Sequence, residues 1–445
     1  MERPVAAVIL AAGQGVRMKS KTPKVLHAVG GKAMLAHAID AAAALSPARI
    51  VVVIGDASDV GEAAKTFHPG ATIAIQAPPR GTGDAVAKAL PALQGFDGVV
   101  LVLYADTPLI EPDTLRTLVG AAAGHAGAVL GFRPVEAGGY GRLVLDKKGG
   151  LERIVEAKDA SPDEISIALC NSGVMAVDAG FLRAALPRLS PNNAKKEYYL
   201  TDIIAMARAE GKGFAVALGD EDEVLGVNSR IELSAAEQIF QERRRILAMA
   251  EGATLIDPST VYFSHDTRLG RDVVIEPNVW FGPGVSVGDG ARIKAYSHLE
   301  GASVGEGAQV GPFARLRPGA DLRKGARVGN FVEVKAATIG EGAKAPHLSY
   351  IGDANVGARA NIGAGTITCN YDGFDKHKTE IGEGAFIGSN SALVAPVVIG
   401  KGAYIGSGSV VTRNVEDDAL AVARGRQHDV KGWAARFRKM HEGKK

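Results

Sequence analysis

The sequence predicts two folds in one chain: an α/β, Rossmann-like domain with a largely parallel, doubly wound sheet, followed by a left-handed parallel β-helix. Three observations predict this. Apolar runs alternate with Ala-rich helical segments in the first half, an aliphatic residue recurs at every sixth position in the second, and the 56 glycines gather in the second half, while aromatic residues make up 5% of the chain. At 445 residues the chain is also too long for one ordinary core.

In the first half, short strands are expected at 5–10, 50–54, 71–75 and 99–103, with helical segments such as 35–45 and 84–93 between them. Ligands of doubly wound sheets bind at the carboxyl ends of the strands. A glycine-rich loop follows the first expected strand, and the turn Tyr104-Ala105-Asp106 follows the fourth. Both are therefore expected at the binding edge.

The pattern changes near residue 228. Apolar residues recur at helical spacing over 229–250, Ser229 and Glu232 form a capping-box pattern, and Gly252 follows as a stop. We therefore predict a front domain over 1–228, a linker helix over 229–252, and a β-helix domain with a C-terminal tail over 253–445. The arginines at 243–245 are expected on a solvated helix face rather than at a phosphate.

A six-residue rhythm predicts the β-helix. Each hexad should give one short strand and one turn, and its aliphatic residue should point into a narrow triangular prism. Three hexads close one coil, so about seven coils are expected to stack as a solenoid. The expected inward residues are Ile275, Phe281, Val287, Ile293, Leu299, Val304, Val310, Leu316, Leu322, Val328, Val334, Ile339, Ala345, Ile351, Val356, Ile362, Ile381, Ile387, Leu393, Ile399 and Ile405. The rhythm breaks between Thr366 and Glu380, where we expect a functional extruded loop.

Composition narrows the class of partner. A net charge of +2 indicates no polyanionic partner such as nucleic acid. Two distant cysteines, Cys170 and Cys369, give neither a disulfide framework nor a metal-ligand spacing, which fits a reducing compartment. The apolar run at 5–12 is too short to span a membrane. We expect a cytoplasmic protein that acts on small molecules.

The segment LAAGQGVRM at 10–18, followed by Pro23-Lys24, is the sharpest motif in the first half. Glycines after a strand let backbone N–H groups approach phosphate oxygens, and Arg17 and Lys24 add positive charge. The string resembles the signature of sugar-1-phosphate nucleotidyltransferases. Further motifs follow in the order of that family, at Gln76, 80–83, 104–109, 139–142, 154–156, 171–173 and 226–228.

With the hexapeptide rhythm behind them, these motifs make the whole chain resemble the bifunctional N-acetylglucosamine-1-phosphate uridyltransferase / glucosamine-1-phosphate acetyltransferase family. The resemblance implies two reactions. Acetyl-CoA acetylates glucosamine-1-phosphate, and UTP then uridylylates the product to give UDP-N-acetylglucosamine and pyrophosphate. It also implies Mg²⁺ at the front site and a homotrimer.

For the front site, the resemblance assigns each group of residues a role. Asp106 and Asn228 would hold Mg²⁺, and Arg17 and Lys24 would neutralise phosphate charge. UTP would contact Leu10, Ala11, Ala12, Gly13, Lys24, Gln76, Gly81 and Thr82, and the acetylated sugar phosphate would contact Gly141, Glu156, Asn171 and Asn228. The attacking phosphate has a second pKa of about 6, so the reaction needs no general base. Val16 and Asp84 depart from the family pattern, where Thr and His are usual.

For the rear site, the resemblance makes His347 the general base and Glu333 the residue that orients or charges it. The sugar phosphate would be held by Arg317, Lys335, Lys376, Tyr350, Asn361, Asn370 and Tyr371, and acetyl-CoA by Ala364, Ser389, Ser407 and Arg424. Arg317 and Lys335 lie 18 residues apart, so they recur on one wall of the prism. Pro346 and Ser407 stand where smaller residues are usual.

Two other functions fit the same domain order. One is a sugar nucleotidyltransferase with a single activity and a structural or regulatory β-helix. The polar residues between Arg317 and Tyr371 argue against it. The other is a regulatory subunit without activity, and the intact Arg17, Lys24 and Asp106 argue against that. The basic tail from Lys431 to Lys445 is expected either to reach a neighbouring subunit or to be disordered.

Overall fold

The computed structural model describes residues 3–13 and 15–442. Gln14 of the glycine-rich motif and the last three residues of the basic tail lie outside this range. The chain divides into two compact units, Met1–Arg243 and Arg244–Lys445, and the division falls within helix α8 (Arg230–Ala250).

The N-terminal unit is built on one nine-stranded sheet. Its main path runs in the order β11-β7-β10-β6-β1-β4-β5, and β8 and β9 form a hairpin that pairs with β10. All pairs along the path are parallel except those of β10 with β6 and β7. The strands are β1 Val5–Ala11, β4 Arg49–Ile54, β5 Thr72–Ile75, β6 Val99–Tyr104, β7 Gly127–Phe132, β8 Arg142–Leu145, β9 Leu151–Val155, β10 Cys170–Asp178 and β11 Phe214–Leu218. A separate two-stranded hairpin pairs β2 (Ala28–Val29) with β3 (Lys32–Ala33).

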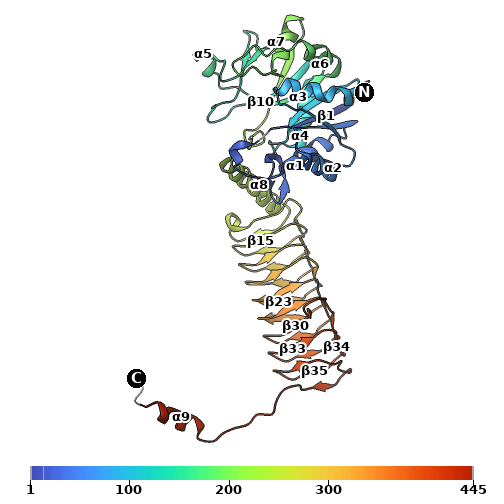
Figure 1. Cartoon of the computed structure of the whole chain (residues 1–445), viewed down its shortest axis with the longest axis vertical. Helices are drawn as coiled ribbons and strands as arrows, with labels where there is room; N and C mark the ends of the chain where they lie inside the picture. Colours follow the sequence, from blue (N-terminus) through green and yellow to red (C-terminus); the bar gives the residue numbers. More distant parts are fainter. Residues whose placement is uncertain (1–2, 14, 443–445) are drawn as a thin grey trace. The chain divides into compact units, whose positions relative to one another are not determined.

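Helices pack on both faces of this sheet, as expected for a doubly wound fold (Figure 1). One buried cluster joins the sheet to α1 Met34–Ala43, α2 Ser58–Phe67 and α4 Pro112–Ala121. A second joins the other face to α3 Thr82–Ala89, α6 Ala179–Ala185 and α7 Asp202–Ala209. The short helix α5 spans Pro162–Ile165, and 3₁₀ helices span η1 Val16–Met18, η2 Lys24–Leu26, η3 Leu90–Leu93 and η4 Leu186–Arg188.

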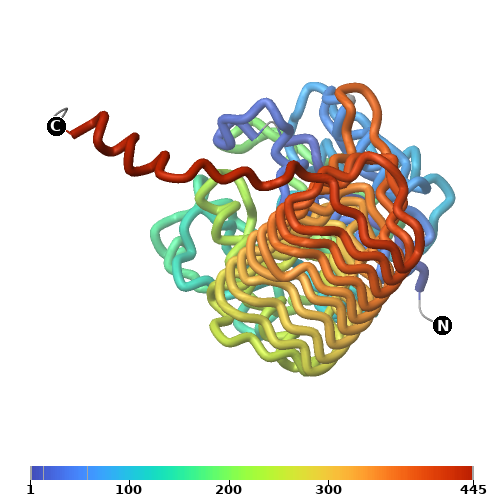
Figure 2. Tube along the Cα trace, turned by 90° about the horizontal axis from the view of Figure 1, so that it is seen from below, coloured from blue at the N-terminus to red at the C-terminus, as the bar shows by residue number. Residues whose placement is uncertain are grey.

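The second unit is a left-handed β-helix whose short strands form three parallel sheets along the solenoid (Figures 1 and 2). The first face holds β12 Thr254–Leu255, β14 Val274–Ile275, β17 Arg292–Ile293, β20 Gln309–Val310, β23 Arg327–Asn330, β26 Lys344–His347, β29 Asn361–Ile362, β32 Phe386–Ile387, β35 Tyr404–Ile405 and β37 Leu420–Ala421. The second holds β13 Arg268–Leu269, β16 Ser286–Val287, β19 Ala302–Val304, β22 Ala320–Leu322, β25 Thr338–Ile339, β28 Ala354–Val356, β31 Thr379–Ile381 and β34 Val397–Ile399.

The third face holds β15 Trp280–Phe281, β18 His298–Leu299, β21 Arg315–Leu316, β24 Glu333–Lys335, β27 Tyr350–Gly352, β30 Ile367–Cys369, β33 Ala392–Val394 and β36 Val410–Val411. A 3₁₀ helix, η5, spans Pro258–Thr260, and α9 spans Trp433–His441. All the residues expected to point inward belong to one buried cluster. The hexad rhythm therefore identified the core of the solenoid correctly.

The three arginines of α8 do not lie on a solvated face, and that expectation is wrong. Within the first unit, Arg243 donates to the carbonyl of Leu109 at 2.8 Å. Within the second, Arg245 is 8% exposed and donates to the carbonyls of Val261 and Ser259. Their positive charge is used to satisfy backbone carbonyls. None of the helices in 3–13 and 15–442 is both long and apolar enough to cross a bilayer.

Candidate active sites

A cavity of about 270 Å³ opens at the carboxyl edge of the first sheet. It gathers segments that are far apart in the sequence: the end of β1, the start of η2, the loop into α3, the end of β6 and the segment before α7. It is lined by Leu10, Ala11, Ala12, Gly13, Lys24, Val25, Gln76, Pro79, Gly81, Thr82, Ala85, Tyr104, Asp106 and Glu197. Every residue expected to contact UTP is in this set.

At one side of this cavity, a cation sits between the two residues expected to hold magnesium. The ammonium of Lys24 forms an ion pair with Asp106 Oδ2 and a hydrogen bond of 3.0 Å with Asn228 Oδ1. The Lys24 side chain is only 8% exposed. The two oxygens therefore converge on one point and already hold a positive charge there, so the site fits a cation.

Two hydrogen bonds from backbone amides hold the segments that carry Asp106 and Asn228 in place. The amide of Val227 donates to the carbonyl of Asp106 at 2.8 Å, and the amide of Asn228 donates to Glu232 Oε2 at 2.7 Å. Glu232 lies in the first turn of α8, whose start ties residue 228 to the sheet edge. The described residues hold no group of three His, Cys, Asp or Glu side chains placed for a metal. A magnesium ion here would take its remaining ligands from phosphates and water.

Asp84 has a clear structural role. Gln76, which is 3% exposed, donates from its amide to Asp84 Oδ2 at 2.9 Å and to the carbonyl of Gly81 at 2.9 Å. The other carboxylate oxygen of Asp84 accepts from Arg80 at 3.1 Å. The carboxylate therefore fixes Gln76 at the cavity wall.

Three of the four residues expected to bind the sugar also come together, and the fourth, Asn228, is the one beside Lys24. The amide of Asn171 donates to the carbonyl of Gly141 at 2.8 Å. A Cβ on Gly141 would lie 3.7 Å from Glu156 Oε1, so these two positions are adjacent. Burial raises the pKa of Glu156 above its ordinary value, and the hydroxyl of Thr201 lies 3.5 Å from its carboxylate. The three residues therefore lie close together, with the carboxyl group of Glu156 partly buried.

Tyr104 lines the nucleotide cavity, and the sequence analysis assigned it no role beyond its place in a motif. Its side chain hydrogen-bonds Thr82, and the negative charges of both Glu156 and Asp106 act on it. Burial, the larger effect, and these charges raise the pKa of Tyr104 well above its ordinary value. The phenol therefore stays neutral, and it lies beside Thr82 in the cavity lining.

Arg17 and Val16 lie apart from this cluster. Both side chains are exposed, with Val16 at 78%, and neither lines the cavity. Arg17 belongs to the expected site by motif only.

In the solenoid, the strand register aligns the rear-site residues in columns. Strand β21 pairs with β24 so that Leu316 lies opposite Val334, which sets Arg317 beside Lys335 on successive coils. The carboxylate of Glu333 accepts from Arg317 at 2.8 Å. Among the described residues, the hydrogen bond of the His347 ring is with Asn330, with 2.7 Å between Nδ1 and Oδ1. Glu333 therefore contacts the phosphate group of residues rather than the histidine.

The backbone of Pro346, just before this histidine, packs closely against Gly329 on the preceding coil. A Cβ on Gly329 would lie 1.8 Å from the carbonyl oxygen of Pro346, so the glycine lets the two coils come close there. The next residues along, Asn330 and His347, are register partners of β23 and β26. The glycine thus makes room for the backbone of residue 346.

A carboxylate that the sequence analysis missed lies among the expected phosphate ligands. Asp353 Oδ2 accepts from Lys335 at 3.1 Å and from Asn370 at 2.5 Å. Burial alone would raise the pKa of Asp353, but these hydrogen bonds outweigh it and hold the pKa below its usual value. Asp353 lies 18 residues after Lys335, one coil further on, and that spacing could have identified it.

Two ammonium groups lie side by side in this cluster. The neighbouring Lys335 lowers the pKa of Lys376, whereas Asp353 raises the pKa of Lys335. Lys376 lies in the extruded loop, which a β-bridge between Tyr371 and Lys376 closes. A phosphate here would relieve the repulsion between the two lysines.

The loop itself is an ordered hairpin around Asp372. Its carboxylate accepts from the amides of Phe374 and Asp375 and contacts His377 Nε2 at 2.7 Å. These contacts hold the pKa of Asp372 far below its ordinary value. Tyr371 is 61% exposed and donates to the carbonyl of Gly373 at 2.6 Å. The hairpin presents Tyr371 and Lys376 at the edge of the cluster.

The residues expected to bind acetyl-CoA continue along one corner of the prism. The amide of Asn390 donates to the carbonyl of Ala364, and the amide of Gly408 to that of Ser389, so Ala364, Ser389 and Ser407 follow on successive coils. A Cβ on Gly408 would lie 3.8 Å from Arg424, which sets that arginine beside Ser407. Tyr350 and Asn361 lie on β27 and β29, one strand beyond β24 and β26 on their faces.

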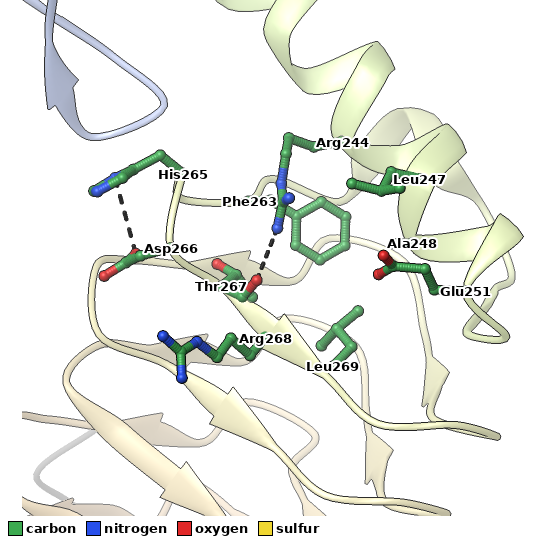
Figure 3. A pocket seen from close by; sticks show the side chains of 10 residues that line it. All are labelled: Arg244, Leu247, Ala248, Glu251, Phe263, His265, Asp266, Thr267, Arg268 and Leu269. Carbon is green, nitrogen blue, oxygen red and sulfur yellow. Dashed lines mark hydrogen bonds and ion pairs between the residues drawn. The ribbon is translucent and has the colours of Figure 1, made fainter. Parts of the chain in front are cut away.

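A cavity of about 470 Å³ at the start of the solenoid is distinct from both sites (Figure 3). Its lining comes from the end of α8 and the first coil. Arg244 donates to the carbonyl of Thr267 at 2.7 Å, and His265 lies 3.9 Å from Asp266. Its charges are of both signs, and we interpret it as part of the cap of the solenoid.

Comparison with known proteins agrees with this geometry. Residues 7–167 match the model of the MobA-like NTP transferase domain, and residues 378–413 match that of the bacterial transferase hexapeptide (six repeats). The chain is 59% identical over 447 residues to the bifunctional protein GlmU of Rhizorhabdus wittichii, covering 100% of this chain and 99% of the relative. It is 55% identical to that of Paramagnetospirillum magneticum, covering 99% and 98%.

A third relative, the bifunctional protein GlmU of Rhodospirillum rubrum, is 59% identical, with 97% of each chain covered. The aligned regions cover essentially the whole length of the chain and therefore both units. The chain therefore belongs to the GlmU family of bifunctional transferases, with a nucleotidyltransferase region in front and hexapeptide repeats behind.

Proposed function

We propose that the chain makes UDP-N-acetylglucosamine in two steps, with one step in each structural unit. The solenoid transfers an acetyl group from acetyl-CoA to glucosamine-1-phosphate. The sheet domain then transfers uridylate from UTP to N-acetylglucosamine-1-phosphate and releases pyrophosphate. The observation that carries this proposal is the cavity at the sheet edge, which collects every residue expected to contact UTP around the Lys24–Asp106–Asn228 cluster.

At the front site, an oxygen of the sugar phosphate attacks the α-phosphorus of UTP, and the bond to the pyrophosphate oxygen breaks. The nucleophile is already largely anionic, so the residues have to align it and neutralise charge. Lys24 and Arg17 supply positive charge, and Gly13, Gly81 and Thr82 hold the nucleotide. Magnesium, when bound by Asp106 and Asn228, would supply further charge neutralisation.

The sugar end is held by Gly141, Glu156 and Asn171. Asn171 and Glu156 offer amide and carboxylate groups to the hydroxyls and the N-acetyl group of the sugar. Tyr104, which lines the nucleotide cavity and hydrogen-bonds Thr82, stays neutral beside the nucleotide.

At the rear site, His347 takes a proton from the amine of glucosamine-1-phosphate. The amine nitrogen then attacks the thioester carbonyl, the carbon–sulfur bond breaks, and the imidazolium returns the proton to the leaving thiolate. The amide of Ala364 donates to the oxyanion. Arg317, Lys335 and Lys376 bind the phosphate, while Tyr350, Asn361, Asn370 and Tyr371 bind the sugar. Ser389, Ser407 and Arg424 line the path of acetyl-CoA.

We infer that the solenoid assembles as a homotrimer, because an exposed apolar stripe runs up one corner beside His347. Tyr296 stacks on Phe313 with ring centroids 4.9 Å apart, and Phe313 stacks on Phe331 at 5.3 Å. With Leu348, these side chains remain between 46% and 58% exposed. All four residues adopt positive φ. A second copy of the chain would bury this stripe. The molar mass of the protein in solution, measured by light scattering, tests this.

A cytoplasmic location follows from the chemistry. Both substrates of the first step and the UTP of the second are soluble metabolites, and Cys170 and Cys369 are free thiols, as a reducing compartment allows.

One coupled assay tests the proposed function. The full-length protein is given glucosamine-1-phosphate, acetyl-CoA, UTP and Mg²⁺, and the products are separated. We expect UDP-N-acetylglucosamine, pyrophosphate and free CoA. Omitting acetyl-CoA should stop both steps, and omitting UTP should leave acetylated sugar phosphate. Uridyl transfer from supplied N-acetylglucosamine-1-phosphate without acetyl transfer would instead support a single-activity enzyme with a structural β-helix.

A further inference from the structure

His347 has one side-chain partner among the described residues, and the motif gave that partner no role. The Oδ1 atom of Asn330 lies 2.7 Å from Nδ1 of His347. Asn330 ends β23 and His347 ends β26, and the two are register partners on successive coils. The contact therefore joins two neighbouring strands of the solenoid rather than two loops.

The scaffold holds the two side chains at this distance. The amide of Leu348 donates to the carbonyl of Asn330 at 2.9 Å, which fixes the backbone on the far side of the histidine. On the near side, Gly329 lets the carbonyl of Pro346 approach more closely than any side chain would allow. Because both flanking positions are fixed by backbone contacts, the amide of Asn330 meets the ring without a flexible segment between them.

The chemistry of the contact decides which ring nitrogen is free. A carboxamide oxygen can only accept a hydrogen bond, so Nδ1 of the neutral ring must carry the proton when it faces that oxygen. The lone pair then lies on Nε2, the other nitrogen, which is the atom able to take a proton from an amine. Glu333 does not compete for this role, because its carboxylate accepts from Arg317 at 2.8 Å.

We propose that Asn330, rather than Glu333, is the positioning residue for His347: its amide oxygen holds the Nδ1–H tautomer and directs Nε2 toward the amine of glucosamine-1-phosphate. This rests on the proposed acetyl transfer at His347. Asn330 lies on the coil before His347, whereas the acetyl-CoA residues Ala364 and Ser389 lie on the coils after it. The orienting group thus leaves that side of the ring free for the substrates.

Two variants of the full-length protein test the proposal. Asn330→Ala removes the acceptor, and we expect kcat for acetyl transfer to fall about 10- to 100-fold. The KM for glucosamine-1-phosphate should change by less than about twofold, because Asn330 orients the base and does not bind the substrate. Asn330→Asp keeps an acceptor oxygen of the same reach and should restore most of the lost kcat.

The tautomer can be observed directly. In protein with ¹⁵N-labelled histidines, with the His347 signals assigned by their loss in His347→Ala, the wild type should show the Nδ1–H form. Asn330→Ala should shift the ring toward a mixture with the Nε2–H form. A merely structural role for Asn330 would not change this equilibrium. Asn355→Ala, at an exposed asparagine on another face of the solenoid, is the matched control and should leave both kcat and the tautomer unchanged.

Three results would overturn the proposal. The first is a kcat for Asn330→Ala within about twofold of the wild type. The second is an unchanged Nδ1–H signal in that variant. The third is an Asn330→Asp variant as slow as Asn330→Ala, because that would mean that the amide NH₂ donates to the ring. If His347→Ala itself retains acetyl transfer, the proposed function of the rear site fails instead, and the two failures are distinguishable.

Discussion

In the sheet domain, the residues that meet at the site are far apart in the sequence: Lys24 contacts both Asp106 and Asn228. In the solenoid, the interacting residues are about one coil apart, as for Asn330 and His347 or Lys335 and Asp353. The first site needs a complete doubly wound sheet before its parts meet. The second needs only a few neighbouring coils in the correct register.

This difference teaches where each site is vulnerable. At the front, the start of α8 and the ends of β1 and β6 must all be in place. A change far from the site can therefore separate Lys24, Asp106 and Asn228. At the rear, a substitution acts on its own column of residues and on little else. The predictions below test this contrast, from the largest expected effect to the smallest.

The largest effects are expected from variants that remove one activity and leave the other. His347→Ala should lower acetyl transfer by about 10²- to 10⁴-fold, because it removes the general base, and leave uridyl transfer unchanged. Asp106→Ala should do the reverse. Each activity is measured separately, with glucosamine-1-phosphate and acetyl-CoA or with N-acetylglucosamine-1-phosphate and UTP. If either variant lowered both activities, the two sites would not be independent.

The second test concerns the cation between Asp106 and Asn228. Lys24→Met should slow uridyl transfer by about 10²-fold, since a positive charge at the phosphates is lost. The same change should tighten binding of Mn²⁺ to the nucleotide-free protein by about tenfold, because the ammonium no longer competes for the two oxygens. Paramagnetic resonance of free Mn²⁺ measures this. Arg17→Met is the control for Mn²⁺ binding, because Arg17 lies apart from the two oxygens. Weaker Mn²⁺ binding by Lys24→Met would contradict the geometry.

The third test addresses Asp84, which fixes Gln76. Asp84→Ala leaves the buried amide of Gln76 without one of its acceptors, a cost of about 1–3 kcal/mol. We expect the KM for UTP to rise about tenfold, measured by initial rates of pyrophosphate release, with acetyl transfer unchanged. Asp84→Asn, which keeps one oxygen acceptor, should lie between the wild type and the alanine variant. An unchanged KM would remove Gln76 from the nucleotide site.

The smallest effect is expected from Asp353, through pH. Its pKa is lowered in the folded protein, so its contribution to stability is present above its unfolded pKa of about 3.9 and is lost as the pH falls through the folded value. Asp353→Asn should therefore lower the free energy of unfolding of the solenoid at pH 7 by under about 1 kcal/mol, and with it the thermal midpoint, and make no difference at strongly acidic pH. Circular dichroism at both pH values measures this, with Asp321→Asn as the control. An equal loss at both pH values would exclude the charged contacts as its cause.

The sequence predicted the solenoid better than any other part of the protein. A hexad position determines both the strand and the direction of its side chain, so every expected inward residue, from Ile275 to Ile405, is buried in one cluster. The column of Arg317 and Lys335 followed from the same spacing. The spacing of 17 residues between Asn330 and His347 carried the same information, but an asparagine is too common in turns to be recognised by type alone.

The front site was predictable by motif but not by geometry. The glycine-rich string identified the cavity residues, whereas no local pattern indicates that the ammonium of Lys24 lies between Asp106 and Asn228. Long-range packing determines that contact. The arginines of α8 show the same limit, because a run of charged residues is typical of solvated helix surface and only the tertiary fold brings Arg245 to the carbonyls of Val261 and Ser259.

Those arginines have a consequence for the solubility of the protein. A parallel solenoid ends in open strand edges, and such edges can pair between molecules to form fibres. At the start of this solenoid, Arg244 and Arg245 occupy the carbonyls of Thr267, Val261 and Ser259 in the first coil. These carbonyls are then unavailable to a strand of another chain. The last turns of α8 thus protect the solenoid against polymerisation from this end.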